Sequence, residues 1–372
     1  MIDHPGAERS DAERPDADAR SAGPVLTVRP GVVERNARRI ANRFDGDLVG
    51  VTKGAAGDPR VARAMLDGGA AALADSRLAN VRRLPNDGDD YERHLLRTPA
   101  HGEVDAAVRD ADVSMQTEPS ILRATAAAAS RRGVEHRVVI AVDVGDRREG
   151  VLPEDLASTL AVADDLDGLS VAGAAAHTGS LNGVVPTADV IRRFVDALED
   201  AEATLGRELP IVSAGSSNAL SLCFAGELHE RATQLRIGEA ILLGTDPTSG
   251  DALPEFETDA FELSADVIER KAKPSAPEGP TGRDAFGEQS SVEDRGVRDR
   301  AIVALGRVDT AVDALTPRRD GVEIVGASSD HAVLDVTDAR GSVRPGDSLA
   351  FDPQYGALAR AAASPYVGIE YE

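Results

Sequence analysis

The stretch DLVGVTKG, residues 47–54, combines an apolar run with a lysine at its end. A short apolar run bounded by polar residues and glycine is typical of a strand in a parallel sheet, because both faces of such a sheet are covered. Lys53 follows that run directly, and it is one of only three lysines in a chain of 372 residues. The stretch therefore predicts a buried parallel strand with a reactive side chain at its carboxyl end.

Seven further apolar runs follow, separated by stretches with helical periodicity over 58–67, 118–132, 153–166 and 187–205; an earlier helix is expected over 30–44. The runs are AALADS (71–76), RHLLRTP (93–99), DVSMQ (112–116), RVVIAVDVG (137–145), SVAGAAAHTG (170–179), PIVSAG (210–215) and ATQLRIGEAILLG (232–244). Eight such runs alternating with helices predict an α/β fold, a (β/α)8 TIM barrel over residues 31–250. An open doubly wound sheet is the alternative, but no G-x-G-x-x-G motif opens the first helix.

After Gly250 the sequence changes to short β-like runs joined by turns. These runs are FELSADVIER (261–270), AIVALG (301–306), VEIVGAS (322–328), AVLDV (332–336) and SLAFD (348–352). They predict a C-terminal all-β domain made of residues 251–372 together with an early strand at 24–30. The Pro- and Gly-rich stretch 273–296 is expected to be a long loop, and loops of that length are usually functional or disordered.

The chain is strongly acidic, with 64 Asp and Glu against 41 Lys and Arg and a net charge of -23 at pH 7. Such a surface repels nucleic acid and anionic membranes. Because the acidic residues are spread along the chain, we interpret them as a halophilic adaptation to a salty cytoplasm, with an acidic functional tail as the alternative.

Residues 1–22 are polar and predict a disordered acidic tail. No apolar run is long enough for a membrane span, and the N-terminus does not have the pattern of a signal peptide. The single cysteine, Cys223, excludes an internal disulfide. These three observations together predict a cytoplasmic location.

Lys53 is the first candidate for chemistry. Side chains at the carboxyl ends of barrel strands face the active site. A lysine desolvated there has a lowered pKa and can form a Schiff base with an aldehyde cofactor. A lysine that simply reaches solvent at the barrel mouth is the structural alternative.

Two further stretches have the features of a phosphate site. AGSSN (214–218) ends the seventh expected barrel strand before a short helix, and RIGE (236–239) ends the eighth. Small residues at a helix N-terminus let backbone N–H groups approach an anion, and the loops after strands seven and eight are the recurrent phosphate site of barrels. A tight turn with a helix cap is the alternative. A lysine and a phosphate site together predict a cofactor with an aldehyde and a phosphate, which is pyridoxal 5'-phosphate.

From about residue 24 to the C-terminus the chain resembles the fold-type III pyridoxal-phosphate enzymes, and most closely the alanine/ornithine racemase family. The motifs that carry the resemblance are VTKG, VSAGSS, QLRIGEAILLG, KPSAPEGPTGRDAFG, RAIVALGR, GASSDH, YGAL and SPYV, in that order. The resemblance implies an isomerase that interconverts L- and D-α-amino acids by two-base α-proton transfer. It also implies a head-to-tail homodimer in which each β domain completes the partner's site, with a free amino acid as substrate.

The resemblance also implies roles for individual residues. Lys53 would carry the cofactor and act as the base on one face of the substrate. Arg236 would donate to the pyridine nitrogen and keep it unprotonated, which favours reprotonation; decarboxylases of this fold place a carboxylate there. The other implied cofactor contacts are Arg148 (or its neighbour Arg147) at the phenolic oxygen, His177 against the ring, and Ser216, Ser217, Gly238 and Tyr355 at the phosphate. The structural alternatives are an ion pair for Arg236, core packing for Tyr355 and a strand-end histidine without a ligand for His177.

The second base departs from the family pattern. Alanine racemases use a tyrosine from the partner's β domain, whereas the nearest match here, DAFG (284–287), contains Phe286, which cannot transfer a proton. The titratable candidates nearby are Asp284, Asp330 and His331, with a turn residue or a surface histidine as the structural alternatives. Ser329 and Asp330 match the loop that receives the substrate carboxylate from the neighbouring subunit.

Other function classes share parts of this pattern. A lyase such as a D-threonine aldolase or D-serine dehydratase would hold a metal through a His and a Cys or Asp near the C-terminus; His331 and Asp330 are present, but no Cys follows Cys223, so no metal is expected. A non-catalytic pyridoxal-phosphate carrier of this fold would be a single barrel. A barrel that binds a sugar phosphate without a cofactor is the simplest alternative. The sequence does not select among alanine, serine, ornithine and lysine as substrates.

Overall fold

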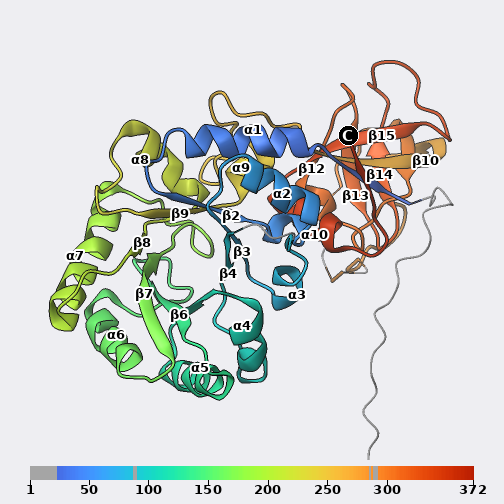
Figure 1. Cartoon of the computed structure of the whole chain (residues 1–372). Helices are drawn as coiled ribbons and strands as arrows, with labels where there is room; N and C mark the ends of the chain where they lie inside the picture. The colour runs from blue at the N-terminus through green and yellow to red at the C-terminus, as the bar shows by residue number, and fades with distance from the viewer. Residues whose placement is uncertain (1–22, 87–89, 285, 288–291) are drawn as a thin grey trace, which may run out of the picture.

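Eight parallel strands close into a barrel at the positions of the eight apolar runs (Figure 1). The computed structural model describes residues 23–86, 90–284, 286–287 and 292–372, so the expected tail at 1–22 lies outside the described residues. The last barrel strand pairs with the first, with Val49 opposite Arg236, which confirms the predicted (β/α)8 barrel and excludes the open sheet. The barrel strands are β2 Asp47–Val51, β3 Ala72–Asp75, β4 Glu92–Leu95, β5 Val113–Gln116, β6 His136–Val142, β7 Leu169–Ala176, β8 Ile211–Ser213 and β9 Gln234–Ile237.

Helices cover the outside of the barrel, and their sequences explain their bounds. In α7, Ala188–Leu205, the Thr187 hydroxyl accepts a hydrogen bond from the backbone N–H of Val190, and Gly206 ends the helix in the left-handed conformation with φ 70°. Its buried side chains recur at helical spacing and face the strands. The other barrel helices are α1 Pro30–Ala41, α2 Pro59–Asp67, α3 Leu78–Val81, α4 Val104–Asp110, α5 Pro119–Arg132, α6 Leu156–Asp164, α8 Leu220–Ala225 and α9 Glu239–Leu243.

One expected strand is partly wrong. The run 232–244 contains β9 and then the helix α9, which begins at Glu239, directly after Gly238. Ala240, Ile241, Leu242 and Leu243 are all buried. A short helix that is apolar on every side has the same sequence pattern as a buried strand, so periodicity does not separate the two.

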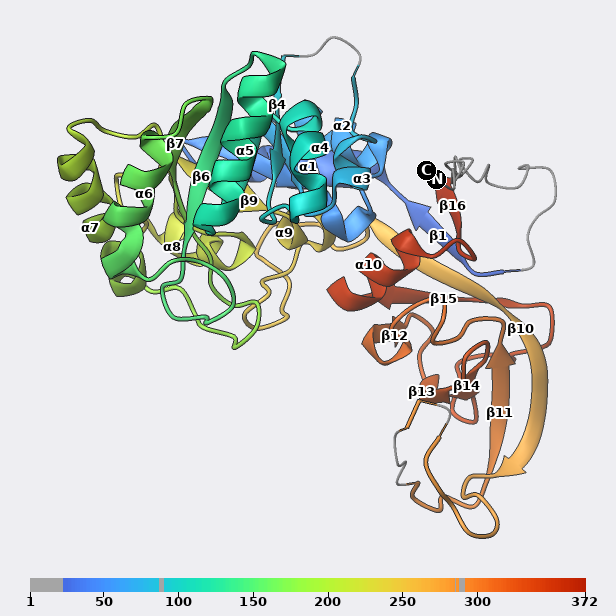
Figure 2. The same cartoon turned by 90° about the horizontal axis from the view of Figure 1, so that it is seen from below.

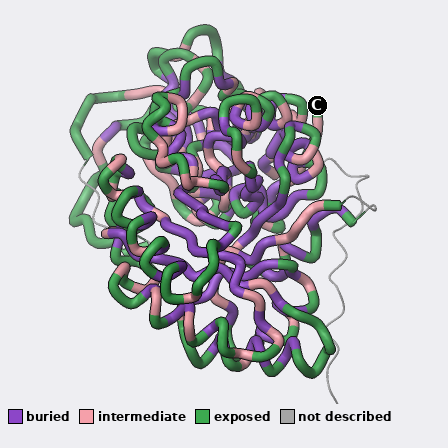
Figure 3. The backbone as a smooth tube through the Cα atoms, turned by 60° about the vertical axis from the view of Figure 1, so that its left-hand side comes forward, coloured by how far each residue is buried: buried purple, intermediate pink, exposed green. Residues whose placement is uncertain are grey.

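The barrel interior is a packed core and not a pore. Val49, Val51, Met115, Val139 and Ile211 belong to two buried clusters within it. Figure 3 shows the barrel strands as mostly buried backbone, with exposed residues on the outer helices and connecting loops. Polar side chains therefore gather at the two ends of the barrel, and the carboxyl end is the one that carries the predicted site.

The C-terminal part forms an antiparallel β domain, with strand order β12-β15-β10-β11-β14-β13. The early strand β1 (Val25–Val28) pairs antiparallel with β10 and parallel with the last strand, β16 (Gly368–Tyr371), so segments from both ends of the described chain lie side by side (Figure 2). The Pro- and Gly-rich stretch joins β10 to β11. The remaining bounds are β10 Phe261–Pro274, β11 Val297–Val303, β12 Leu315–Pro317, β13 Glu323–Ala327, β14 Ala332–Asp335 and β15 Ser348–Pro353.

The β domain also contains a helix, α10 (Tyr355–Ala363), that the prediction of an all-β domain did not include. Its buried residues Ala357, Leu358, Ala361 and Ala362 form one helical face. The helix packs against the short 3-10 helix η1 (Lys53–Ala55) at the barrel mouth, and one hydrophobic core continues from the barrel into the β domain. This contact brings Tyr355 to the end of β2. No helix of the described residues has the length and apolar character needed to cross a membrane.

Candidate active site

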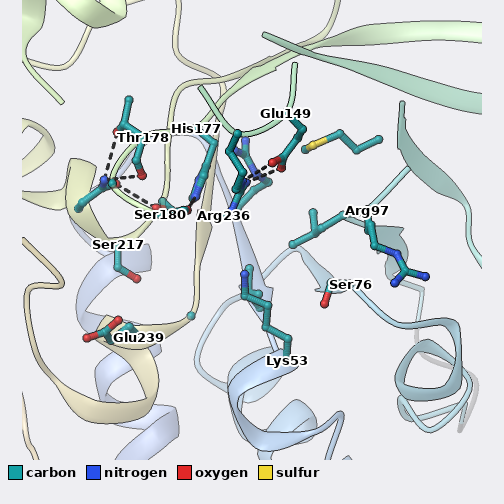
Figure 4. A pocket seen from close by; sticks show the side chains of 18 of the residues that line it. Lys53, Ser76, Arg97, Glu149, His177, Thr178, Ser180, Ser217, Arg236 and Glu239 are labelled. Atoms are coloured by element: carbon teal, nitrogen blue, oxygen red, sulfur yellow. Dashed lines mark hydrogen bonds and ion pairs between the residues drawn. The ribbon is translucent and has the colours of Figure 1, made fainter. Parts of the chain in front are cut away.

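A cavity of about 690 Å³ opens at the carboxyl ends of the barrel strands (Figure 4). All eight residues that the sequence resemblance assigned to the cofactor line this cavity, although they come from five strands or the loops that follow them and from α10. They are Lys53, Arg148, His177, Ser216, Ser217, Arg236, Gly238 and Tyr355.

Lys53 lies in the turn that follows β2 and extends into the cavity (Figure 4). Its side chain is accessible from the cavity, but the surrounding protein removes enough water to lower the pKa of its ammonium group. Arg148 and, more weakly, Arg236 lower this pKa further, whereas Asp75 and Glu149 raise it. A lowered pKa increases the neutral fraction of the amine, which is the form that attacks a carbonyl or accepts a proton.

Arg236 is held in one orientation by oxygen atoms of neighbouring strands. Its guanidinium donates to the carbonyl of Ala176 at 2.7 Å and to the hydroxyl of Ser213. Within the described part of the chain it forms no ion pair, so the alternative of a structural ion pair at the barrel rim finds no support. Burial, followed by the charge of Arg148, lowers the pKa of Arg236 to about 10, so the group is still positively charged at neutral pH.

His177 and Arg148 complete the wall around Arg236. The ring of His177 contacts the hydroxyl of Ser180, and its pKa is lowered to about 3 by burial and then by the charges of Arg236, Arg148 and Lys53. The imidazole is therefore neutral. Arg148 forms an ion pair with the adjacent Glu149 at the cavity wall, whereas Arg147 does not line the cavity. Of the two arginines that the sequence left open, Arg148 is the one that faces the site.

The side of the cavity near β8 and β9 presents neutral donors. The Ser217 hydroxyl accepts a hydrogen bond from the backbone N–H of Ala240 at 3.2 Å, and the Ser216 hydroxyl donates to Asn218 at 2.9 Å. Burial is the main cause that raises the pKa of Tyr355 to about 12, so its phenol keeps its proton and can donate. Gly238 leaves little room for a side chain, because an added Cβ would lie 3.2 Å from the carbonyl oxygen of Val51. Hydroxyl and N–H donors grouped in this way suit an anion.

Four acidic side chains of the site were missed at the sequence level. Glu118, Glu149 and Glu239 line the cavity, and Asp75 lies buried at the end of β3. Burial raises the pKa of Glu239, whose carboxylate accepts a long hydrogen bond from the Thr245 hydroxyl at 3.4 Å. Glu239 follows Gly238 in the quoted RIGE motif, so its position was a visible signal. Among 64 acidic residues, nothing distinguished the other three.

The four residues proposed for the partner's site do not line this cavity. Asp284 lies 3.6 Å from the guanidinium of Arg307, which also stacks over the ring of Phe286 at 4.9 Å. The backbone N–H of Arg307 donates to the carbonyl of Ser328, next to the predicted Ser329, Asp330 and His331. The structure therefore brings the two predicted loops together around Arg307, which sequence analysis did not single out. In the described residues, no three His, Cys, Asp or Glu side chains are grouped so that they could hold a metal ion.

A closed barrel with a lysine and an anion cradle at the carboxyl ends of its strands, joined to a β domain, defines the class of fold-type III enzymes. A family model for the N-terminal domain of alanine racemase matches residues 28–246. Ornithine racemase of Acetoanaerobium sticklandii is 39% identical over 296 residues, covering 79% of this chain and 83% of that protein. Lysine racemase of Thermotoga maritima is 37% identical over 352 residues, covering 94% and 98%. The chain belongs to the alanine racemase family and is an amino-acid racemase, an isomerase.

Solved structures with the same fold include two alanine racemases. The enzyme of Streptomyces coelicolor superposes with a TM-score of 0.70 at 20% identity, over 96% of this chain and 99% of that one. Alanine racemase of Bartonella henselae, whose structure has covalently bound pyridoxal phosphate, gives 0.67 at 14% identity, over 94% and 99%. D-threonine aldolase of Filomicrobium marinum gives 0.67 at 17% identity, over 91% and 88%. Because a lyase is as similar as the racemases, these likenesses establish the fold alone.

Proposed function

We propose that the protein is a pyridoxal-phosphate-dependent racemase of basic α-amino acids, with Lys53 holding the cofactor. The observation that carries the proposal is the position of Lys53, in a cavity lined by every other predicted cofactor contact. The basic substrate is supported by the relatives, of which one is an ornithine racemase and the other a lysine racemase.

The residues present fit this cofactor on three sides. The neutral donors near β8 and β9 suit its phosphate, Arg236 presents a fixed cationic donor for a ring nitrogen, and Lys53 presents an amine of lowered pKa for its aldehyde. His177 is neutral, so its ring can pack against an aromatic ring without bringing a further charge beside Arg236. When bound, the cofactor supplies an aldehyde for the substrate amine and a ring that delocalises the electron pair left by the α-proton.

Racemisation then requires a proton acceptor and a proton donor on opposite faces of the substrate. Lys53 serves one face, since its lowered pKa favours the neutral amine. Arg236, which is positively charged at neutral pH, would keep a ring nitrogen of the bound cofactor unprotonated, and this would favour return of the proton to the substrate over side reactions. For the other face we place the donor in the cluster around Arg307, which holds Asp284 and lies beside Asp330 and His331.

This assignment implies a head-to-tail homodimer. Asp284, Asp330 and His331 do not line the cavity of their own chain, so they can act only on the site of a neighbouring subunit. We propose the salty cytoplasm as the compartment, on the net charge of -23.

The test is reduction of the full-length protein with borohydride after addition of pyridoxal phosphate, followed by peptide mass spectrometry. We expect an absorbance band near about 420 nm that collapses on reduction, with the adduct on Lys53. Lys271 and Lys273 are exposed and serve as internal controls. The variant Lys53→Ala should lose both the adduct and the racemisation of ornithine and lysine. An adduct distributed over all lysines, or racemisation by the variant, would refute the proposal.

A further inference from the structure

Asp75 is a fully buried carboxylate at the carboxyl end of β3, with 0% of its surface exposed. It accepts hydrogen bonds from the Thr52 hydroxyl at 2.9 Å, from the backbone N–H of Arg77 at 2.9 Å and from the Asn80 amide at 3.1 Å. No lysine or arginine of the described residues forms an ion pair with it. Burying a charge without a cationic partner costs free energy, and such groups concentrate at functional sites.

The Thr52 hydroxyl connects Asp75 to the cofactor lysine. Thr52 is also fully buried, and its backbone N–H donates to the carbonyl of Ala74 at 2.9 Å, so the ends of β2 and β3 are tied together at this point. Lys53 is the next residue. On the other side of the turn, Gly54 packs tightly under Tyr355, since an added Cβ would lie 3.0 Å from its ring. The backbone that presents Lys53 is therefore fixed from one side by Asp75 and from the other by α10.

The charges that face Lys53 come from several elements. Arg148 and Arg236 are cationic and disfavour its ammonium form, whereas Asp75 and Glu149 favour it. Glu149 is already bound to Arg148 as an ion pair. His177 is neutral and Tyr355 keeps its proton. Asp75 is thus the carboxylate in this group whose charge no arginine neutralises.

We propose that Asp75 is the positioning residue of Lys53: its carboxylate holds the turn that presents the lysine and offsets the positive charge of Arg236, since Glu149 already pairs with Arg148. The inference rests on the proposed function only in taking Lys53 as the lysine that holds the cofactor. The charge coupling between Asp75 and Lys53 can be measured without cofactor or substrate.

The small number of lysines allows a direct measurement. Reductive methylation of the full chain, freed of cofactor, with 13C-formaldehyde labels Lys53, Lys271 and Lys273 and the N-terminus, so a two-dimensional NMR titration resolves each lysine. The variant Lys53→Arg identifies the Lys53 signal by its loss. Lys271 and Lys273, both bound to Glu269, report changes unrelated to the site.

We expect Asp75→Asn, which keeps the shape but removes the charge, to lower the titration midpoint of Lys53 by about one pH unit. The midpoints of Lys271 and Lys273 should stay unchanged. An unchanged or raised Lys53 midpoint would show that Asp75 is uncharged in the folded protein and would overturn the charge-balancing role.

The positioning role is tested with Thr52→Val and its conservative counterpart Thr52→Ser, which also serve if the Asp75 variant does not fold. The readout is the rate at which added pyridoxal phosphate is trapped on Lys53 by borohydride. We expect a loss of about tenfold for Thr52→Val and a rate near that of the parent for Thr52→Ser, because a displaced amine meets the aldehyde less often. Equal rates for the two variants would overturn the positioning role, whereas no trapping in the parent would refute the proposed function instead.

Discussion

Removing the hydroxyl of Tyr355 is expected to weaken the binding of pyridoxal phosphate while leaving the fold intact. Tyr355 begins α10 and lines the same cavity as Ser217 and Gly238. Within the described residues its hydroxyl makes no hydrogen bond, so the variant Tyr355→Phe leaves no protein group unpaired. The side chain's burial and its packing over Gly54 are unchanged by the loss of one oxygen atom.

The size of the effect follows from the donors at this end of the cavity. The predicted phosphate contacts are two serines, a glycine and Tyr355, with no lysine or arginine among them. Each neutral donor therefore contributes a larger share of the free energy of phosphate binding. A hydrogen bond to a charged group contributes roughly 1.5–3 kcal/mol, which corresponds to a loss of about 10- to 150-fold in affinity.

The assay is a titration of cofactor-free protein with pyridoxal phosphate, followed by absorbance. The control is Tyr366→Phe, which removes the same atom from a side chain that is 66% exposed and outside the cavity. Equal affinities of the Tyr355 variant and the parent would refute the assignment of Tyr355 to the phosphate.

Three further predictions concern stability. Burial lowers the pKa of His136 from 6.5 to about 4. Between these two pH values the unfolded chain therefore binds a proton that the folded protein does not. The free energy of unfolding should consequently fall by about 3 kcal/mol from pH 7 to pH 4. His136→Gln should remove this part of the acid sensitivity in urea unfolding at the two pH values, and an unchanged pH dependence would contradict the assignment. With a net charge of -23, the melting temperature should rise by roughly 5 °C or more between 0.1 and 2 M KCl, and a fall would contradict self-repulsion as the cause. Gly173→Ala should lower the free energy of unfolding by at least about 3 kcal/mol, because the added Cβ would lie 1.9 Å from the Ile211 carbonyl oxygen. The control is Gly102→Ala, whose added Cβ meets no atom within 4 Å and should be tolerated in the same unfolding assay.

The barrel was predictable because each of its strands is buried on both faces. Runs such as the one ending at Lys53 are apolar throughout, and their regular alternation with helices has few other solutions. Burial on every side also explains why α9 was not predicted, because its four buried residues have the same apolar pattern as a continuation of β9. The helix α10 was missed because its face is mostly alanine, which gives a weak periodic signal in an alanine-rich chain.

The site was predictable where a residue type stands out from its surroundings. Lys53 is conspicuous because lysine is so rare here, and the glycine and serine motifs have recognised geometry. Asp75 was not, because an aspartate at the end of an apolar run is usually a solvated turn residue, and only the fold reveals that it is buried against Thr52. The residues around Arg307 come from loops that are distant in sequence, so their grouping also required the fold.

The pairing of β1 with β10 and β16 has a consequence for how the protein is made. β1 is synthesised before the barrel, whereas its two partners, β10 and β16, are synthesised only after the whole barrel. During that interval β1 has two unpaired edges, and Leu26 and Val28, which end up buried, are open to other chains. The barrel can close first, since domains fold as units during synthesis. Because β16 follows the barrel in the chain, its pairing with β1 is a late step in the folding of the β domain.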